Sequence, residues 1–239
     1  MLDQKRVVCI TGGSRGIGAA CVRRFLKECY HVVYCSRNKE DLFLLKDELS
    51  SEYDTALLHP FEADMASLDD ISQLFSYIQK QFGVLNCLIN NAAVIEVANA
   101  ESVSIDSFKK QMDVNVLGVF SCIQNAIPLM KESGGNIVNV SSLSGIKGVE
   151  KFPGFSVYAM TKSSIVGLTE VLAVELKEFN INVNCIAPGA VDTDMLRYAA
   201  PDLKTTTMPE NIADSIYFLS NPSQSSQLTG SILEVHSNE

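Results

Sequence analysis

Short apolar runs alternate with amphipathic stretches along the whole of this 239-residue chain, and this alternation constrains its fold more than any other feature. Several of the short runs are apolar at every position, as expected for parallel strands that are covered on both faces. Strand and helix patterns in regular succession predict a doubly wound parallel sheet with right-handed crossovers. We therefore expect an α/β protein with a seven-stranded parallel sheet and helices on both of its faces.

The expected elements follow one another without a linker, an internal repeat or a low-complexity region, which predicts a single domain over residues 1–239. In sheets of this kind the ligand lies beyond the carboxyl ends of the strands, so the residues that follow the strands are the candidate site residues. The predicted strands are 6–10, 31–35, 56–61, 87–90, 136–141, 182–186 and 232–235, and the predicted helices are 17–29, 39–51, 68–82, 105–130, 156–179 and 209–219.

Composition and charge exclude several classes of protein. The chain is 46% hydrophobic and 20% charged, as soluble globular proteins are, and no run approaches the roughly 18 apolar residues of a membrane helix. Its N-terminus lacks the layout of a secretory signal. A net charge of −9 gives no excess of basic charge for binding nucleic acid, and it disfavours contact with an anionic membrane surface. We expect a cytoplasmic protein with a small-molecule partner, without nucleic-acid or membrane binding.

The cysteines indicate free thiols rather than a disulfide framework or a metal site. There are seven, an odd number, and no C-x-x-C pair occurs. Most lie in apolar runs, which predicts buried thiols in a reducing compartment. None of the three histidines has a ligand-like spacing to them, so no metal is expected.

The first predicted strand runs directly into the sequence TGGSRGIG at residues 11–18, and a predicted helix follows. Glycines allow a tight turn close to a pyrophosphate, whose negative charge the amides at the start of the helix then hold. The same residues can form a simple turn, but their position favours a dinucleotide site of the Rossmann type. No Gly-Lys-Ser/Thr follows, which excludes a P-loop. The candidate cofactor-binding residues here are Gly12, Ser14, Arg15, Gly16, Ile17 and Gly18.

The spacing TGxxxGxG is one residue wider than GxGxxG, and with the motifs that follow it resembles the single-domain branch of the short-chain dehydrogenase/reductase family. The resemblance extends from Arg6 to Val235 and implies an oxidoreductase that uses a nicotinamide dinucleotide. The sequence at 90–93 departs from the family pattern, because it ends in Ala where the family has Gly. The matching motifs, in the family's order, are NNAA at 90–93, Asn115, Ser142, YxxxK at 158–162 and PGxxxT at 188–193.

The end of the second strand, about 20 residues past the glycines, separates NAD from NADP enzymes. An Asp or Glu there binds the ribose 2′-hydroxyl and would repel a 2′-phosphate. Here the position reads Ser36, Arg37 and Asn38, and Arg15 can reach the same phosphate from the glycine turn. Both arginines can also be solvated surface residues. Without an acidic competitor they favour NADP(H).

Two further candidates have a structural alternative. The resemblance implies that Asp64 helps to hold the adenine ring, but Asp64 can equally cap the helix that follows it. It also implies that Thr193 contacts the nicotinamide carboxamide, although a turn residue or a helix cap is an alternative. The remaining cofactor contacts that the resemblance implies are Met65, Asn91, Ala92, Ala93, Pro188, Gly189 and Val191.

Tyr158 and Lys162 are four residues apart in a helical stretch, so their side chains project from one face. A free phenol has a pKa near 10, and a neighbouring ammonium, joined by the positive charge of an oxidised nicotinamide, lowers it. Such a pair can also be two amphipathic surface side chains. The resemblance implies that Tyr158 is the proton donor to a carbonyl oxygen and that Lys162 also binds the nicotinamide ribose.

Ser142 and Asn115 complete the candidate catalytic set. Ser142 follows the fifth strand and can hydrogen-bond both the carbonyl and the tyrosine hydroxyl. Ser141 and Ser144 are rivals, and the family's paired-serine motif favours Ser142. The resemblance implies that Asn115 distorts its helix and holds a water for proton relay, whereas a purely structural Asn is the alternative. No histidine falls near these motifs in the sequence, and this chemistry needs none.

Three regions bear on the substrate and on assembly. Phe152, Pro153 and Phe155 form either a wall of the pocket mouth or a surface bulge. The segment between Thr193 and Pro209 is short for a lid, which suggests an open site and a loose or small-carbonyl specificity. The last strand resembles that of the family but lacks its Asp-Gly-Gly ending; in relatives this strand and two central helices build dimers and tetramers, so a homo-oligomer is expected.

These expectations converge on an NADPH-dependent carbonyl reductase, with Tyr158 as proton donor. One alternative is a 3-oxoacyl-[acyl-carrier-protein] reductase, which the net charge of −9 does not encourage because carrier proteins are acidic. The other is a dinucleotide-binding regulator or scaffold without chemistry. The complete set of Asn115, Ser142, Tyr158 and Lys162 argues against the scaffold, which needs only the binding loop.

Overall fold

The computed structural model describes residues 6–236, and its seven strands form one parallel sheet in the order β3-β2-β1-β4-β5-β6-β7. The chain leaves β1 through β2 and β3 and then returns to the other side of β1 with β4, so the switch point of the sheet lies between β1 and β4. This confirms the predicted Rossmann-like fold. The strands are β1 (Val7–Thr11), β2 (His31–Ser36), β3 (Leu58–Glu62), β4 (Cys87–Asn90), β5 (Gly135–Val140), β6 (Ile181–Pro188) and β7 (Ile232–Val235).

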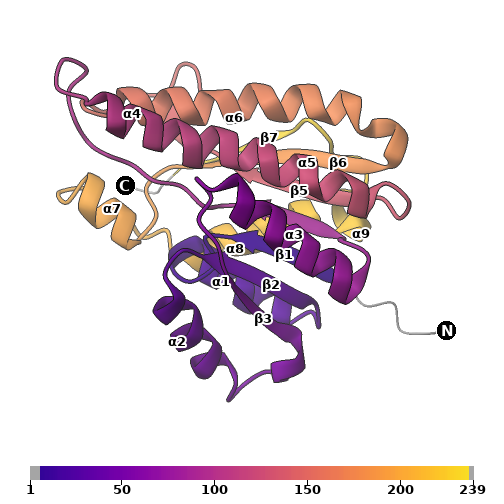
Figure 1. The fold of residues 1–239 in the computed structure, drawn as a ribbon. Coiled ribbons are helices and arrows are strands. Elements are labelled where there is room, and N and C mark those ends of the chain that lie inside the picture. The colour runs from indigo at the N-terminus through magenta and orange to yellow at the C-terminus, as the bar shows by residue number, and fades with distance from the viewer. Residues whose placement is uncertain (1–5, 237–239) are drawn as a thin grey trace.

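Helices cover both faces of the sheet, and each layer buries its own apolar cluster against it (Figure 1). The five inner strands are nearly all buried, which explains why their sequences are largely apolar, whereas the edge strands β3 and β7 are mostly half-buried. One layer contains α1 (Gly16–Leu26), α2 (Lys39–Leu49) and α8 (Pro209–Ser220), and the other contains α3 (Leu68–Phe82), α4 (Ile105–Met112), α5 (Gly118–Met130) and α6 (Ser156–Glu175).

The predicted helix 105–130 is wider in its middle than an α-helix. A π-helical segment, Asp113–Leu117, separates α4 from α5. There the backbone N–H of Gly118 donates to the carbonyl of Asp113, five residues back. One wide turn barely changes the apolar periodicity, so the sequence pattern reads as a single helix. The π segment contains Asn115, as the expected distortion requires.

Other boundaries differ for local reasons. The third strand starts at Leu58 rather than at 56, because Asp54 caps a short 3₁₀ helix, Thr55–Leu57. β3 carries Pro60, which an edge strand tolerates because one side of its backbone is unpaired. Two short helices were not predicted, namely α7 (Asp194–Ala199) and α9 (Pro222–Ser225).

Within residues 6–236, α6 alone is long and apolar enough to cross a membrane, judged by length and composition. The helix packs on the sheet through residues such as Ile165 and Leu172. It also carries the buried Lys162. It is therefore a core helix of this fold.

Six of the seven cysteines are buried free thiols, as predicted. Cys29 is the exception, because it lies exposed in the turn after α1 with a positive φ of 58°. The prediction of buried thiols is therefore wrong at this position, because α1 ends at Leu26 rather than at residue 29. Among the described residues, no group of three or more His, Cys, Asp or Glu side chains is arranged to hold a metal ion.

Candidate active site

A cavity of about 820 Å³ lies at the carboxyl edge of the sheet, and segments that follow all seven strands contribute to its walls. Its volume is typical of small-molecule and cofactor sites. The sheet thus brings together residues that are far apart in the sequence. The predicted site residues that line the cavity are Gly12, Ser14, Arg15, Gly16, Ile17, Ser36, Arg37, Asp64, Met65, Asn91, Ala92, Ala93, Ser142, Tyr158, Lys162, Pro188, Gly189, Val191 and Thr193.

The glycine turn fits a dinucleotide pyrophosphate. Gly12 has a positive φ of 65°, and a Cβ there would lie 2.8 Å from the Cα of Ala92. A Cβ on Gly18 would lie 2.0 Å from the carbonyl oxygen of Gly12. No side chain caps the start of α1, which leaves the first amides of the helix available to an anion. Only glycine at positions 12 and 18 allows the backbone to pack this closely.

Two predicted cofactor residues, Gly18 and Asn38, do not line the cavity. Gly18 supports the turn through the close packing just described. Asn38 caps α2, since its side-chain oxygen accepts hydrogen bonds from the backbone N–H groups of Glu40 and Asp41 at 2.9 and 3.3 Å. Both residues therefore shape the dinucleotide end of the site indirectly.

The end of the cavity beside β2 is basic. Arg15 and Arg37 both line it and are exposed, and Ser36, the last residue of β2, lines it as well. Within the described part of the chain, neither guanidinium forms an ion pair with a carboxylate. Asp64 also lines this end, and its side chain accepts a hydrogen bond from the backbone N–H of Ala66 at 3.0 Å. The cap expected at the next helix is instead supplied by Ser67.

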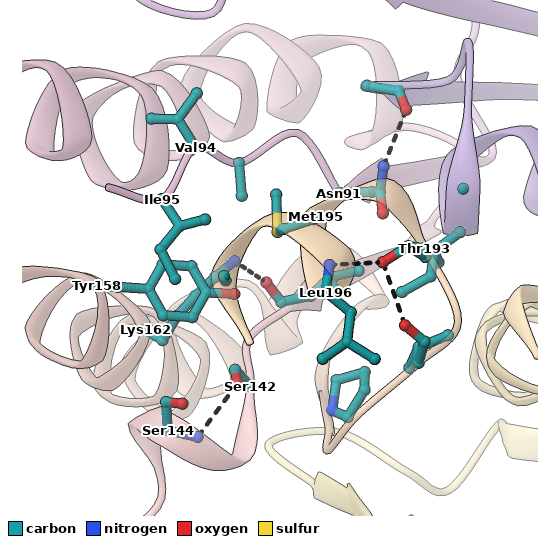
Figure 2. A pocket seen from close by; sticks show the side chains of 18 of the residues that line it. Asn91, Val94, Ile95, Ser142, Ser144, Tyr158, Lys162, Thr193, Met195 and Leu196 are labelled. Carbon is teal, nitrogen blue, oxygen red and sulfur yellow. Dashed lines mark hydrogen bonds between the residues drawn. The ribbon is translucent and has the colours of Figure 1, made fainter. Parts of the chain in front are cut away.

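The opposite end contains Ser142, Tyr158 and Lys162, which Figure 2 shows close together on neighbouring elements. Tyr158 and Lys162 lie one turn apart on α6 and are both buried, with exposed fractions of 8% and 3%. The Lys162 ammonium donates a 2.7 Å hydrogen bond to the carbonyl of Val140 and lies 5.6 Å from the centre of the Tyr158 ring. The pair therefore faces the cavity and not the solvent.

Burial dominates the electrostatics of this pair. It raises the pKa of Tyr158 to about 12, and the Ser142 hydroxyl acts in the opposite direction. It lowers the pKa of Lys162 to about 8, because the ammonium has lost its water. The expected lowering of the Tyr158 pKa is thus not produced by the protein groups, since Lys162 directs its ammonium to Val140.

The three neighbouring serines have different surroundings. Ser141 is buried and donates a 2.8 Å hydrogen bond to the backbone carbonyl of Lys162, so it ties β5 to α6. Ser142 faces the cavity, and its oxygen accepts a 3.1 Å hydrogen bond from the backbone N–H of Ser144 (Figure 2). Ser144 also lines the cavity. Because the hydroxyl of Ser142 acts on Tyr158, the geometry favours Ser142 over its two rivals.

Asn115 does not line the cavity, and its side chain is fully engaged. Its oxygen accepts from the backbone N–H of Val94 at 2.8 Å, and its amide donates to the carbonyl of Val94 at 2.8 Å and to Thr161 Oγ1 at 3.1 Å. The side chain therefore joins the loop after β4 to α6. This clamp holds the wall of the cavity next to the helix that carries Tyr158.

Sequence reasoning missed several residues of the wall. It named no histidine as a site residue, whereas His236 follows β7 directly and lines the cavity. The rule that parallel strands end at one edge was sufficient to find it. The other unpredicted wall residues come from the loop after β4, from α4 and from the segment around α7; they include Val94, Ile95, Lys110, Met195, Leu196, Tyr198, Leu203 and Lys204.

Comparison with known proteins agrees with this geometry. The family model described as short chain dehydrogenase matches residues 6–204. L-fucose dehydrogenase of Mus musculus is 33% identical over 223 residues, which are 92% of this chain and 78% of that protein.

Two solved structures are similar over almost their full length. A blue fluorescent protein from a metagenomic library, in complex with NADPH, superimposes with a TM-score of 0.86 at 30% identity and covers 97% of this chain and 96% of its own. The 3-ketoacyl-(acyl-carrier-protein) reductase from Brucella melitensis, complexed with NADH, has a TM-score of 0.87 at 29% identity with the same coverage. The fold, the glycine turn, the Ser142–Tyr158–Lys162 group and these similarities together establish that the chain belongs to the short-chain dehydrogenase/reductase family of oxidoreductases.

Proposed function

We propose that this protein is an NADPH-dependent oxidoreductase that reduces a carbonyl group of a small molecule to an alcohol. The observation that carries the proposal is that one cavity contains a dinucleotide turn at one end and the Ser142–Tyr158–Lys162 group at the other. A scaffold that only bound a dinucleotide would not need a buried lysine beside a buried phenol. Burying an unpaired ammonium costs free energy, so its retention favours a chemical role.

Residues at one end of the cavity bind the cofactor, and residues at the other end position the substrate and donate the proton. The glycine turn and the start of α1 hold the pyrophosphate, while Pro188, Gly189, Val191 and Thr193 form the wall next to the catalytic end. When bound, the nicotinamide supplies the hydride. The chain supplies orientation, exclusion of water and a proton, which Tyr158 donates from its hydroxyl to the carbonyl oxygen. Ser142 hydrogen-bonds that oxygen and keeps it within reach of the phenol.

The pKa values favour the direction of reduction. With a pKa of about 12, Tyr158 keeps its proton throughout the neutral range and can act as an acid there. Alcohol oxidation requires the phenolate instead, so its rate should rise with pH. Lys162 carries a positive charge below a pKa of about 8, and its ammonium, held by the carbonyl of Val140, lies at the same end of the cavity as Tyr158.

The basic end supports the preference for NADPH. Arg15 and Arg37 line the cavity on the side of β2, and neither is neutralised by a carboxylate within residues 6–236. A 2′-phosphate carries negative charge that a guanidinium can bind with several hydrogen bonds. NADH lacks this phosphate and would leave both arginines without a partner.

The proton role is tested with Tyr158→Phe, which removes the hydroxyl and retains the ring. NADPH oxidation at 340 nm with a panel of carbonyl compounds should fall at least about 100-fold, as expected for loss of general acid catalysis. The dissociation constant of NADPH, measured by fluorescence titration, should change less than about threefold. Binding of NADPH by the unaltered protein without turnover of any carbonyl compound would instead support the scaffold.

The cofactor preference is tested with Arg37→Asp. The ratio of kcat/KM for NADPH to that for NADH should fall at least about tenfold, because a carboxylate now faces the phosphate. Arg23→Asp is a matched control, since Arg23 lies on the outer side of α1 and does not line the cavity. An unchanged ratio in Arg37→Asp would contradict the assignment.

We also propose that the protein self-associates through the solvent-facing side of the helix layer that contains α5 and α6 (Figure 1). Leu117 at the end of the π segment is 44% exposed, Phe120 on α5 is 40% exposed, and Val171 and Val174 on α6 are 55% and 76% exposed. Light scattering after size-exclusion chromatography should give at least a dimer. Val174→Lys should reduce the mass, whereas Leu44→Lys on α2 should not. A monomer at micromolar concentration would refute this proposal.

A further inference from the structure

The mouth of the cavity is bordered by large apolar side chains that are incompletely buried. Phe152 is 45% exposed and belongs to the loop after β5. On the α7 segment, Met195 and Leu203 are each 38% exposed and Tyr198 is 63% exposed, and all three line the same cavity. Exposed apolar side chains that gather at an opening mark a binding surface. A ligand that covers them gains free energy by removing them from water.

An aromatic series connects this mouth to the catalytic tyrosine. The ring centres of Phe152 and Phe155 lie 5.7 Å apart, and those of Phe155 and Tyr158 lie 6.0 Å apart at 86°. Exposure falls along the series, from 45% at Phe152 to 8% at Tyr158. The wall is therefore apolar from the solvent inward to the ring that carries the reactive hydroxyl.

Apolar residues continue this surface around Tyr158. Ile95 and Met195 line the cavity on the side of Tyr158 (Figure 2). Apart from the buried Lys162, the charged residues at the same end are all exposed. A polyol would need hydrogen-bond partners inside the cavity for each hydroxyl that it buries. The exposed charged residues are Lys110, Glu150, Asp194 and Lys204.

We propose that the substrates are ketones or aldehydes whose carbonyl is attached to a bulky apolar ring system, which lies between the Phe152–Phe155 wall and the α7 segment. This inference rests on the proposed function and adds the substrate class to it. In the reaction, the carbonyl carbon gains the hydride of NADPH and the carbonyl oxygen gains the proton of Tyr158, giving the alcohol and NADP⁺. The size of the apolar body, and not a small carbonyl, then determines catalytic efficiency, contrary to what the short lid suggested.

The first experiment compares cyclohexanone with 2-decalone, which has the same ring ketone and four additional carbons, at saturating NADPH. Each fully buried methylene contributes roughly a fourfold gain in binding. The kcat/KM for 2-decalone should therefore exceed that for cyclohexanone at least about 30-fold. L-fucose with NADP⁺ and a 3-oxoacyl thioester with NADPH complete the panel, because they represent polyol and acyl substrates.

The second experiment removes one side chain of the wall. Phe152→Ser should lower kcat/KM for 2-decalone about tenfold, mainly through KM, and should leave cyclohexanone within about twofold. Phe43→Ser is a matched control, because Phe43 is 44% exposed, lies on α2 and does not line the cavity. It should leave both substrates unaffected, and equal urea midpoints of the two variants show that folding is intact.

The outcomes separate the two claims. Turnover of ketones with equal efficiency for both sizes overturns the substrate class and leaves the oxidoreductase intact. So does a best substrate that is the sugar or the thioester, or an equal effect of Phe152→Ser on both ketones. Absence of turnover with every compound, although NADPH binds, overturns the proposed function and with it this inference.

Discussion

Lys162 makes folding stability depend on pH in a way that can be calculated. Its side chain is 3% exposed, and burial lowers its pKa from an ordinary value of 10.5 to about 8. The two values differ by about 2.5, which corresponds to about 3 kcal/mol. Because the pKa is lower in the folded state, this free energy is a cost to folding. It is fully present below pH 8 and disappears above pH 10.5.

The variant Lys162→Met isolates this contribution, since it retains most of the side-chain volume and cannot be charged. At pH 7 the charged lysine costs about 3 kcal/mol of folding free energy, and at pH 9.5 the remaining cost is about 1 kcal/mol. The unaltered protein should therefore gain about 2 kcal/mol relative to Lys162→Met between these two pH values. Loss of the hydrogen bond to Val140 shifts the variant by the same amount at both pH values, so it cancels from this difference.

Urea denaturation at pH 7.0 and 9.5, followed by far-UV circular dichroism, measures the difference directly. Lys80→Met on the surface of α3 serves as the control and should show no pH-dependent difference from the unaltered protein. Parallel pH profiles of the unaltered protein and Lys162→Met would refute the reasoning. They would mean that the ammonium is hydrated in the folded protein and that burial does not set its pKa.

Three further outcomes follow from the same contacts. Gly18→Ala places a Cβ 2.0 Å from the carbonyl oxygen of Gly12, so α1 must shift. Urea denaturation should show a free energy of unfolding that is lower by about 1–3 kcal/mol, and NADPH should bind more weakly. Asn115→Ala removes both hydrogen-bond partners of the Val94 backbone and should lower the free energy of unfolding, measured in urea, by about 2–4 kcal/mol. An unchanged free energy of unfolding would contradict the role of Asn115 as a clamp. Ellman's reagent should titrate one thiol, that of Cys29, in the native protein and all seven in urea; rapid reaction of more than one native thiol would contradict the burial of the others.

The order of strands and helices could be read from the sequence because burial on both faces leaves a continuous apolar signal. The π segment at Asp113–Leu117 could not, since it changes backbone hydrogen bonding and hardly changes which residues face the core. The six-residue helix α7 was equally hard to see, because it has no buried face to create a pattern. Local signals still marked its start, where Thr193 accepts a hydrogen bond from the N–H of Leu196.

The candidate site was predictable to the extent that its residues belong to short motifs next to strand ends. The motifs gave the positions of Tyr158 and Lys162 but not the direction of the ammonium, which depends on the carbonyl of Val140 in a strand 22 residues earlier. In the same way, Asn38 stands at a sequence position that predicts a cofactor contact, but its side chain caps α2. His236 belongs to no motif, and it reaches the site because it directly follows β7, whose register places its carboxyl end beside that of β6.

The hydrogen bonds from Ser141 and Lys162 join strand β5 to helix α6, whereas Phe152, Met195, Tyr198 and Leu203 stand on loops and on a two-turn helix. Reactivity and selectivity are consequently encoded by separate parts of the polypeptide. Random mutagenesis confined to those four mouth positions should yield a high proportion of folded, active clones with altered preferences. Proteins that share this arrangement can acquire new substrates by substitution at the mouth while the reaction centre remains unchanged.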